Sequence, residues 1–88
     1  MRMVLCDVTY LDRTVTVNVK PDHTVGEVLE TAASYYEVTF YDTLALNNTL
    51  VLIPAGKPAE VLPEEMEVSE LVKQLGEKPQ LELIVQES

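Results

Sequence analysis

The chain has a single cysteine, and this scarcity excludes several kinds of stabilising site. No internal disulfide can form, and iron–sulfur or zinc sites with four cysteine ligands are impossible. Without such cross-links, 88 residues must fold around one modest hydrophobic core, which leaves little interior for an elaborate active site. Apolar residues supply 47% of the sequence, enough for such a core. We therefore expect one domain over residues 1–88, in a reducing compartment, without a deep enzymatic cleft.

Positive charge is also scarce, with six Lys and Arg against fifteen Asp and Glu and a formal net charge of −9. The six cations are scattered, so neither nucleic acid nor an anionic membrane surface is an expected partner. If charge steers association, it steers toward a protein with a basic surface. No apolar run approaches the roughly 18 residues of a membrane span, and the first residues lack the pattern of a signal peptide. We expect a cytoplasmic protein, or a nuclear one, without direct membrane binding.

Two strands are predicted at the start of the chain. Residues 14–20 alternate strictly between apolar and polar side chains, as in a half-buried strand. Residues 3–10 form a weaker strand by the same parity, and residues 11–13 connect the two as a tight antiparallel turn. The predicted inward residues are Val4, Cys6, Val8, Tyr10, Val15, Val17 and Val19. The same parity turns Met3 and Leu5 outward.

A helix is predicted directly after this hairpin. Pro21 ends the second strand because proline cannot donate to a strand ladder. Thr24 and Glu27 have the spacing of a capping box, so the helix should begin at Thr24. An apolar stripe then follows at helical spacing through Val25, Val28, Leu29, Ala32, Ala33 and Tyr36. This stripe predicts that the helix covers the apolar face of the hairpin.

The second half of the sequence predicts three more strands and a short helix. Asn47-Asn48 separates two apolar runs, and both residues tolerate the left-handed conformations of tight turns. A proline-rich, irregular connection follows, and Gly76 ends a short helical segment. The predicted elements are strands at 43–46 and 49–53, a helix at 69–75 and a closing strand at 80–85. In the closing strand, Leu81, Leu83 and Val85 share one side.

The order strand, strand, helix, strand, strand, short helix, strand resembles the ubiquitin-like β-grasp, an α+β fold. The resemblance implies a mixed sheet of four to five strands wrapped around one main helix, with the last strand beside the first. Within that superfamily, VTYLDRTVTVNVKPDHTVGEVLETAASYYEV resembles the hairpin, helix start and long helix of the first lobe of FERM domains. YDTLAL and SELVKQL resemble further segments of that lobe. The resemblance implies a non-catalytic, protein-binding lobe of a cytosolic scaffold or adaptor in signalling.

A second resemblance is to Ras-association and Ras-binding domains, which share this fold. Those domains use basic residues of the second strand and first helix to contact a small GTPase, which implies a role for Arg13 and Lys20 here. Glu27 and Glu30 on the helix oppose this alternative, because they would repel an acidic partner.

No catalytic, cofactor-binding or metal-binding residue is predicted. His23 lies in the turn before the helix without a nucleophile placed beside it by any motif, and Cys6 points inward as a core residue. The acidic residues at 64–70 lack the ligand spacing and central glycine of a calcium loop. Gly-Gly does not occur in the chain, so conjugation through such a tail is not expected.

Instead, we predict a protein-binding surface on the hairpin. Met3 and Leu5 point outward and Leu11 lies in an exposed turn, so they offer apolar contacts in acidic surroundings. The predicted set is Met3, Leu5, Leu11, Arg13, Thr16, Asn18 and Lys20.

Overall fold

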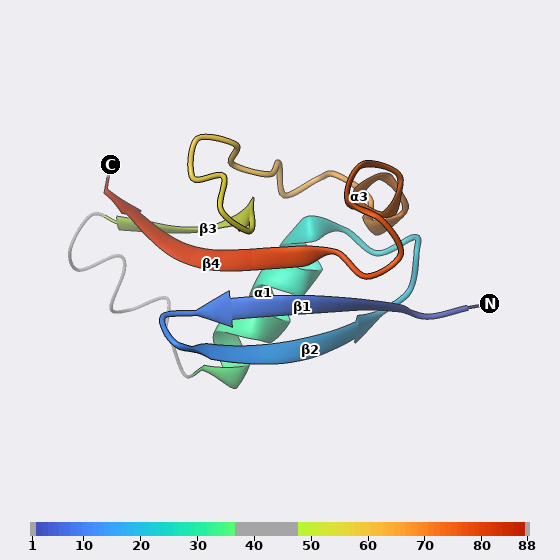
Figure 1. The fold of residues 1–88 in the computed structure, drawn as a ribbon, viewed down its shortest axis with the longest axis horizontal. Helices are drawn as coiled ribbons and strands as arrows, with labels where there is room; N and C mark the ends of the chain where they lie inside the picture. The colour runs from blue at the N-terminus through green and yellow to red at the C-terminus, as the bar shows by residue number, and fades with distance from the viewer. Residues whose placement is uncertain (1, 37–47, 88) are drawn as a thin grey trace.

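A computed structural model describes residues 2–36 and 48–87 (Figure 1). Its elements are β1 (Val4–Tyr10), β2 (Arg13–Val19), α1 (Val25–Tyr35), β3 (Asn48–Pro54), α3 (Val68–Leu75) and β4 (Gln80–Glu87). The predicted strand at 43–46 lies outside the described residues. Residues 55–67 form no strand or helix, consistent with three prolines in and beside this connection.

The four described strands form one mixed sheet in the order β2-β1-β4-β3. β1 pairs antiparallel with β2 and parallel with β4, and β3 pairs antiparallel with β4. The last strand therefore lies beside the first, as the resemblance implied. α1 crosses one face of this sheet, and α3 lies at one end, near the beginning of β4 (Figure 1).

The hairpin turn is shorter than predicted. Tyr10 pairs with Arg13, which leaves Leu11 and Asp12 as a two-residue turn and starts β2 one residue early. Leu11 has a φ of 58°, in the left-handed region that favours glycine and asparagine. The prediction of a three-residue connection over 11–13 was wrong, because polarity alone did not show that Arg13 joins the ladder.

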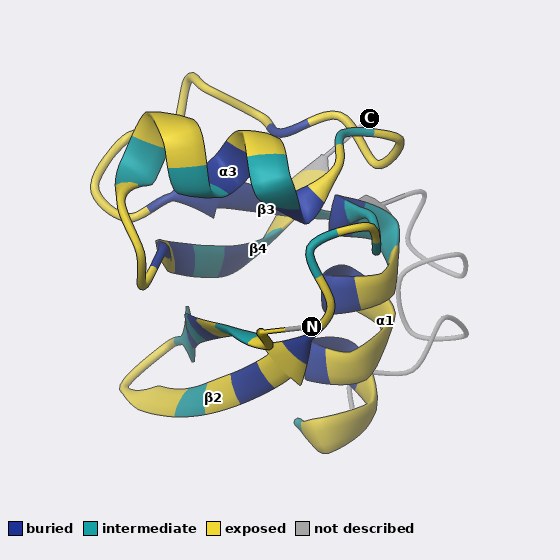
Figure 2. Cartoon of the chain, turned by 90° about the vertical axis from the view of Figure 1, so that its right-hand side faces the viewer, coloured by how far each residue is buried: buried dark blue, intermediate teal, exposed yellow. Residues whose placement is uncertain are grey.

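The core lies between the sheet and α1. The parity predictions are confirmed for Cys6, Val8, Val17 and Val19, all buried, while Val4, Tyr10 and Val15 are partly buried against the same cluster. The apolar stripe of α1 is buried on the side that faces the sheet (Figure 2). The remaining buried members of the cluster are Leu52, Leu62, Val68, Leu71, Leu81 and Leu83. Val85 follows the inward parity of β4 but is 39% exposed, because it pairs with Leu50 near the end of the sheet.

The N-terminus of α1 is capped by backbone rather than by the predicted capping box. The Thr24 side chain makes no capping hydrogen bond, and the Glu27 carboxylate lies 3.1 Å from His23 Nδ1 instead. The first free amides of the helix are already satisfied: Val25 N–H donates to Met66 O and Gly26 N–H donates to Glu64 O, both at 2.8 Å. The capping-box prediction was wrong, because residues 40 positions away took the place of the side-chain cap.

The start of α3 is capped in the same way by the turn before α1. Val68 N–H donates to His23 O at 2.8 Å, and Ser69 N–H donates to Pro21 O at 3.0 Å. The segment before each helix thus supplies carbonyl acceptors to the first amides of the other helix. Thr24 also forms an isolated antiparallel bridge with Glu67. α3 begins at Val68, one residue earlier than the sequence predicted.

The close approach of residue 64 to α1 favours a glycine at position 26. A Cβ at Gly26 would meet the carbonyl oxygen of Glu64 at 3.3 Å, the same oxygen that accepts the Gly26 N–H. The two segments pack closely here because no side chain separates them.

Candidate functional site

The predicted binding residues divide into groups along the hairpin. Met3 and Leu5 are 42% and 43% exposed at the start of β1, and Leu5 pairs with Asn18. Lys20 directly follows Val19, the partner of Val4, and so lies at this same end. The structure therefore brings Met3, Leu5, Asn18 and Lys20 together.

Leu11 and Arg13 lie at the opposite end of the hairpin. Leu11 is 82% exposed in the turn, and the Arg13 guanidinium lies 5.8 Å from the ring centre of Tyr36. At about 3.3 Å per residue, the six residues from Leu5 to Leu11 span roughly 20 Å. The structure does not bring Leu11 and Leu5 into one patch, and it separates Arg13 from Lys20 along the full length of β2.

Thr16 lies between these groups in a polar network on the outer face of the sheet. Its hydroxyl donates to the Asp7 carboxylate at 2.7 Å, and Gln80 Nε2 donates to the same carboxylate at 3.0 Å. Lys78 Nζ approaches Asp7 at 3.6 Å. The hydrogen bonds from Gln80 and Thr16, aided by the charge of Lys78, hold the pKa of Asp7 below its ordinary value. A charged carboxylate therefore links the middle of the hairpin to the start of β4.

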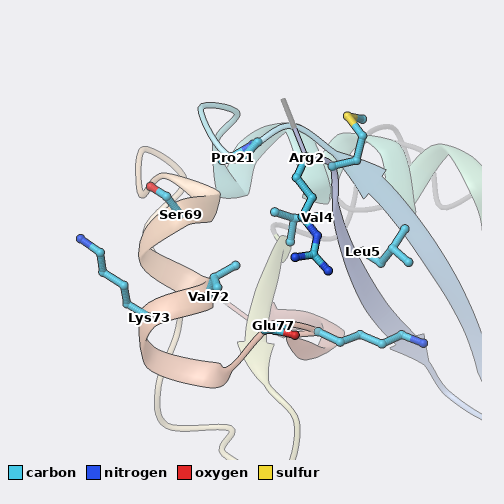
Figure 3. Close-up of a pocket in the computed structure, with 10 residues that line it drawn as sticks. Arg2, Val4, Leu5, Pro21, Ser69, Val72, Lys73 and Glu77 are labelled. Atoms are coloured by element: carbon cyan, nitrogen blue, oxygen red, sulfur yellow. The ribbon is translucent and has the colours of Figure 1, made fainter.

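Beside Met3 and Leu5 the surface is hollowed. A groove of about 600 Å³ runs between the start of β1 and α3 (Figure 3), and we call it the β1–α3 groove. Its volume falls within the range of roughly 300–1,000 Å³ that is usual for ligand-binding clefts. The apolar residues of its lining are Met3, Val4, Leu5, Pro21 and Val72. Val72 extends from α3 toward the strand, so both walls present apolar atoms (Figure 3).

Cations gather around this groove. Its charged lining residues are Arg2, Lys73, Glu77 and Lys78, so three of the chain's six Lys and Arg side chains border it against one carboxylate. Arg2 extends between Val4 and Leu5, whereas Lys73 points outward from α3 (Figure 3). The charge at the groove is thus opposite in sign to the net charge of −9.

The exposed face of α1 has the reverse character. Glu27 and Glu30 are exposed there, and no basic residue lies in the last turn of the helix. A partner with a basic surface, as the net charge predicts, would find complementary charge on α1 rather than at the groove.

The groove exists because β4 does not continue alongside the first residues of β1. The parallel pairing begins at Asp7 and Gln80, with Asp7 N–H donating to Pro79 O at 3.0 Å. Gly76 ends α3 with a φ of 96°, a conformation that side chains disfavour, and the chain turns there toward the buried Pro79. The chain therefore reaches the sheet only at Gln80, and the start of β1 faces α3 across an unfilled gap.

The two residues considered for catalysis, Cys6 and His23, have different surroundings in the structure. Cys6 is fully buried, and burial, with a smaller contribution from Asp7, raises the pKa of its thiol to about 11. The burial confirms Cys6 as a core residue. A thiol at that pKa carries almost no thiolate at neutral pH. His23 is paired with Glu27 across one helical turn.

Neither a metal-ligand cluster nor a membrane-spanning helix occurs within residues 2–36 and 48–87. In that part of the chain, no three His, Cys, Asp or Glu side chains gather as a ligand set for a metal ion. None of the helices there is long and apolar enough to cross a bilayer.

Several lining residues of the groove were not predicted from the sequence. Arg2, Val72 and Lys78 come from three separate segments, and periodicity within one segment does not show that they meet. One sequence signal pointed to the groove: Val72 is an apolar residue next to the buried stripe of the short helix. In the structure the Val72 side chain is only partly buried.

Comparison with known proteins identifies the fold. No protein-family model matches the sequence, and no curated protein matches it. Among solved structures, a designed protein based on ubiquitin is 24% identical, with a TM-score of 0.69 over 98% of this chain and 92% of its own. The ubiquitin of Caldiarchaeum subterraneum is 16% identical, with a TM-score of 0.71 over 99% of this chain and 98% of its own.

A third similar structure is an N-terminal ubiquitin-like domain solved in solution. It is 16% identical, with a TM-score of 0.66, and covers 99% of this chain and 78% of its own. At such identities the likeness shows the fold and not the activity. The chain has the ubiquitin-like β-grasp fold, with a four-stranded mixed sheet and one main helix.

Proposed function

We propose that this chain is a non-catalytic protein-binding module and that its contact surface is the β1–α3 groove. The observation that carries the proposal is the coincidence, at one end of the sheet, of exposed Met3 and Leu5 with an apolar groove bordered by cations. An apolar centre with a polar or charged rim is the usual composition of a protein contact surface.

The proposal uses part of the surface predicted from sequence. Met3, Leu5, Asn18 and Lys20 remain together at the groove end, while Leu11 and Arg13 lie too far away for the same small contact. Cys6 is buried and the pKa of its thiol is raised, so it is a poor nucleophile, which supports a binding role over one in cysteine-based catalysis.

Site-specific photo-crosslinking in the native cells tests the proposal. A photoreactive phenylalanine analogue replaces Leu5 in one variant and Glu30, on the exposed face of α1, in a matched control. We expect a discrete crosslinked protein from position 5, and loss of that product when Val72→Asp is added, because an ionised side chain would disrupt the apolar wall.

The control position makes the outcome decisive. Circular dichroism must first show that the Val72→Asp variant remains folded, and Val72→Thr is the substitute if it does not. A product from position 30 and none from position 5 would contradict the proposal and favour a basic partner on α1. Crosslinking of the same protein from both positions would also contradict it, since the two sites lie on different faces.

A narrower proposal, that the module is a lobe of a cytoplasmic scaffold of the FERM kind, is supported by the sequence resemblance. The mass of the native polypeptide tests it. A product much larger than 9.8 kDa agrees with this narrower role, and a free chain near 9.8 kDa contradicts it.

A further inference from the structure

We propose that the β1–α3 groove binds an extended, acidic segment of a partner protein, which adds as a strand to the open edge of β1 at Met3 and Leu5. This inference rests on the proposed function and specifies the chemistry of the partner. Two independent features of the groove carry it: unpaired backbone groups and local positive charge.

The backbone of β1 is open on the groove side. In a strand, the N–H and C=O groups of alternate residues point to the same edge. Asp7 donates toward β4, so the groups of Leu5, two residues earlier, point toward the groove. Within residues 2–36 and 48–87, neither the Leu5 N–H nor its C=O has a backbone partner on that side. An unpaired donor and acceptor at a strand edge are a template for another strand.

The protein's own chain cannot close this edge in the observed arrangement. By the parallel register, the partner of the Leu5 carbonyl would be the N–H of residue 79, and Pro79 has none. Residue 77 would supply the acceptor for the Leu5 N–H, but no such hydrogen bond forms. A peptide from another protein would supply both groups, in the manner of known strand-addition complexes.

The charge of the groove selects an acidic occupant. Arg2 and Lys78 line the groove beside the open edge, and among residues 2–36 and 48–87 the ion-pair contact of the Lys78 ammonium is the long one of 3.6 Å to Asp7. An ammonium has three donors, so Lys78 retains capacity for a carboxylate of the partner. The remainder of the chain is strongly acidic and would repel the same segment elsewhere, which restricts it to this site.

The outer edge of β2 is the competing place for strand addition. β2 is the last strand of the sheet on that side, and Thr16 and Asn18 alternate with the residues that bond β1. The lining of the β1–α3 groove does not extend along that edge, and the cations Arg13 and Lys20 lie at opposite ends of β2. The β1 edge is therefore the better site for an acidic segment, and the experiment distinguishes the two edges.

The test is a titration of the ¹⁵N-labelled full chain with an end-blocked peptide that has a Val-Ile-Val-Ile centre flanked by Asp and Glu. We expect shifts and slowed hydrogen exchange at the Leu5 amide, and no saturable binding of the matched Lys-flanked peptide. N-methylation of alternate peptide nitrogens should abolish binding, because it removes the donors that a ladder requires.

A pair of charge reversals isolates the groove from overall charge. Arg2→Glu should weaken binding of the acidic peptide about tenfold, whereas Lys57→Glu, the same change on an exposed loop outside the groove, should change it less than about twofold. Protection at Thr16 and Asn18 instead of Leu5, equal effects of the two reversals, or no shift at about millimolar peptide would each overturn the inference.

These outcomes separate the inference from the proposed function. If crosslinking from position 5 captures a partner in cells while the acidic peptide fails to bind, the groove is a contact surface for some other chemistry and strand addition is wrong. If position 5 captures nothing, the proposed function fails with it.

Discussion

Tyr36→Phe tests how the end of α1 is fastened to the hairpin. The Tyr36 hydroxyl donates to Val8 O at 2.7 Å and to Arg13 O at 2.9 Å, sharing one proton between two carbonyls of β1 and β2. Its ring lies 5.4 Å from that of Tyr10. Phenylalanine keeps this ring contact and removes only the hydroxyl, so the change isolates the hydrogen bonds.

The expected loss is about 0.5–1.5 kcal/mol, the net worth of a neutral hydrogen bond in a folded protein. For a domain of 60–100 residues, a loss of about 1 kcal/mol lowers Tm by roughly 4–8 °C. Urea unfolding followed by far-UV circular dichroism measures the change, and the slope m should stay constant because the same surface is exposed on unfolding. The matched control is Tyr35→Phe, since Tyr35 is 68% exposed and its hydroxyl bonds no described residue. That variant should remain within about 0.5 kcal/mol of the parent.

The pH dependence gives a second check on the same residue. Burial raises the pKa of Tyr36 above its ordinary value of 10.0. The hydroxyl's contribution should therefore be complete below about pH 10 and decline as the pH rises further, because the unfolded chain ionises first. The stability gap between the parent and Tyr36→Phe should narrow above pH 10. Equal stability of the two proteins at pH 7, or equal losses in Tyr35→Phe and Tyr36→Phe, would refute the reasoning.

Four further predictions concern single side chains. Asp7→Asn should lower the urea midpoint more at pH 7 than at pH 3, because a depressed pKa gives stability that declines as the pH falls below about 4. An equal loss at both pH values would contradict this. Thr24→Ala should cost less than about 0.5 kcal/mol in urea unfolding, compared with about 1 kcal/mol for a working cap. Leu11→Asn should raise the free energy of unfolding by about 1 kcal/mol by relieving the left-handed strain, and a loss of stability would count against it. The Cys6 thiol, with its pKa raised to about 11, should react with a disulfide reagent at pH 8 only through unfolding, so rapid modification in native buffer would be inconsistent with the structure.

Sequence patterns predicted the fold where burial repeats along one element. Period-two alternation located the inward faces of β1 and β2, and the stripe from Val25 to Ala33 located the buried face of α1. These signals are local and strong, because every second or every third to fourth residue must leave water. The strand order came from the resemblance, since periodicity within a strand does not specify its neighbour.

Long-range backbone contacts were outside the reach of such patterns. The amides of Val25 and Gly26 bond carbonyls about 40 residues later, and a capping-box sequence looks the same whether or not those carbonyls are present. Likewise, the β1–α3 groove joins Arg2, Val72 and Lys78, and its open edge depends on where Pro79 meets the register of β1. No single stretch of sequence contains that relation.

Hydrogen exchange in the free protein decides most directly whether β1 has an open edge at the groove. NMR would compare the Leu5 amide, which points toward the groove, with the adjacent Cys6 amide, which points toward its partner Val17 on β2. We predict exchange at Leu5 at least about a hundredfold faster than at Cys6, because only the second amide is held in a ladder. Equal protection of the two amides would show that the edge is already closed, and it would contradict the proposed binding of a partner strand.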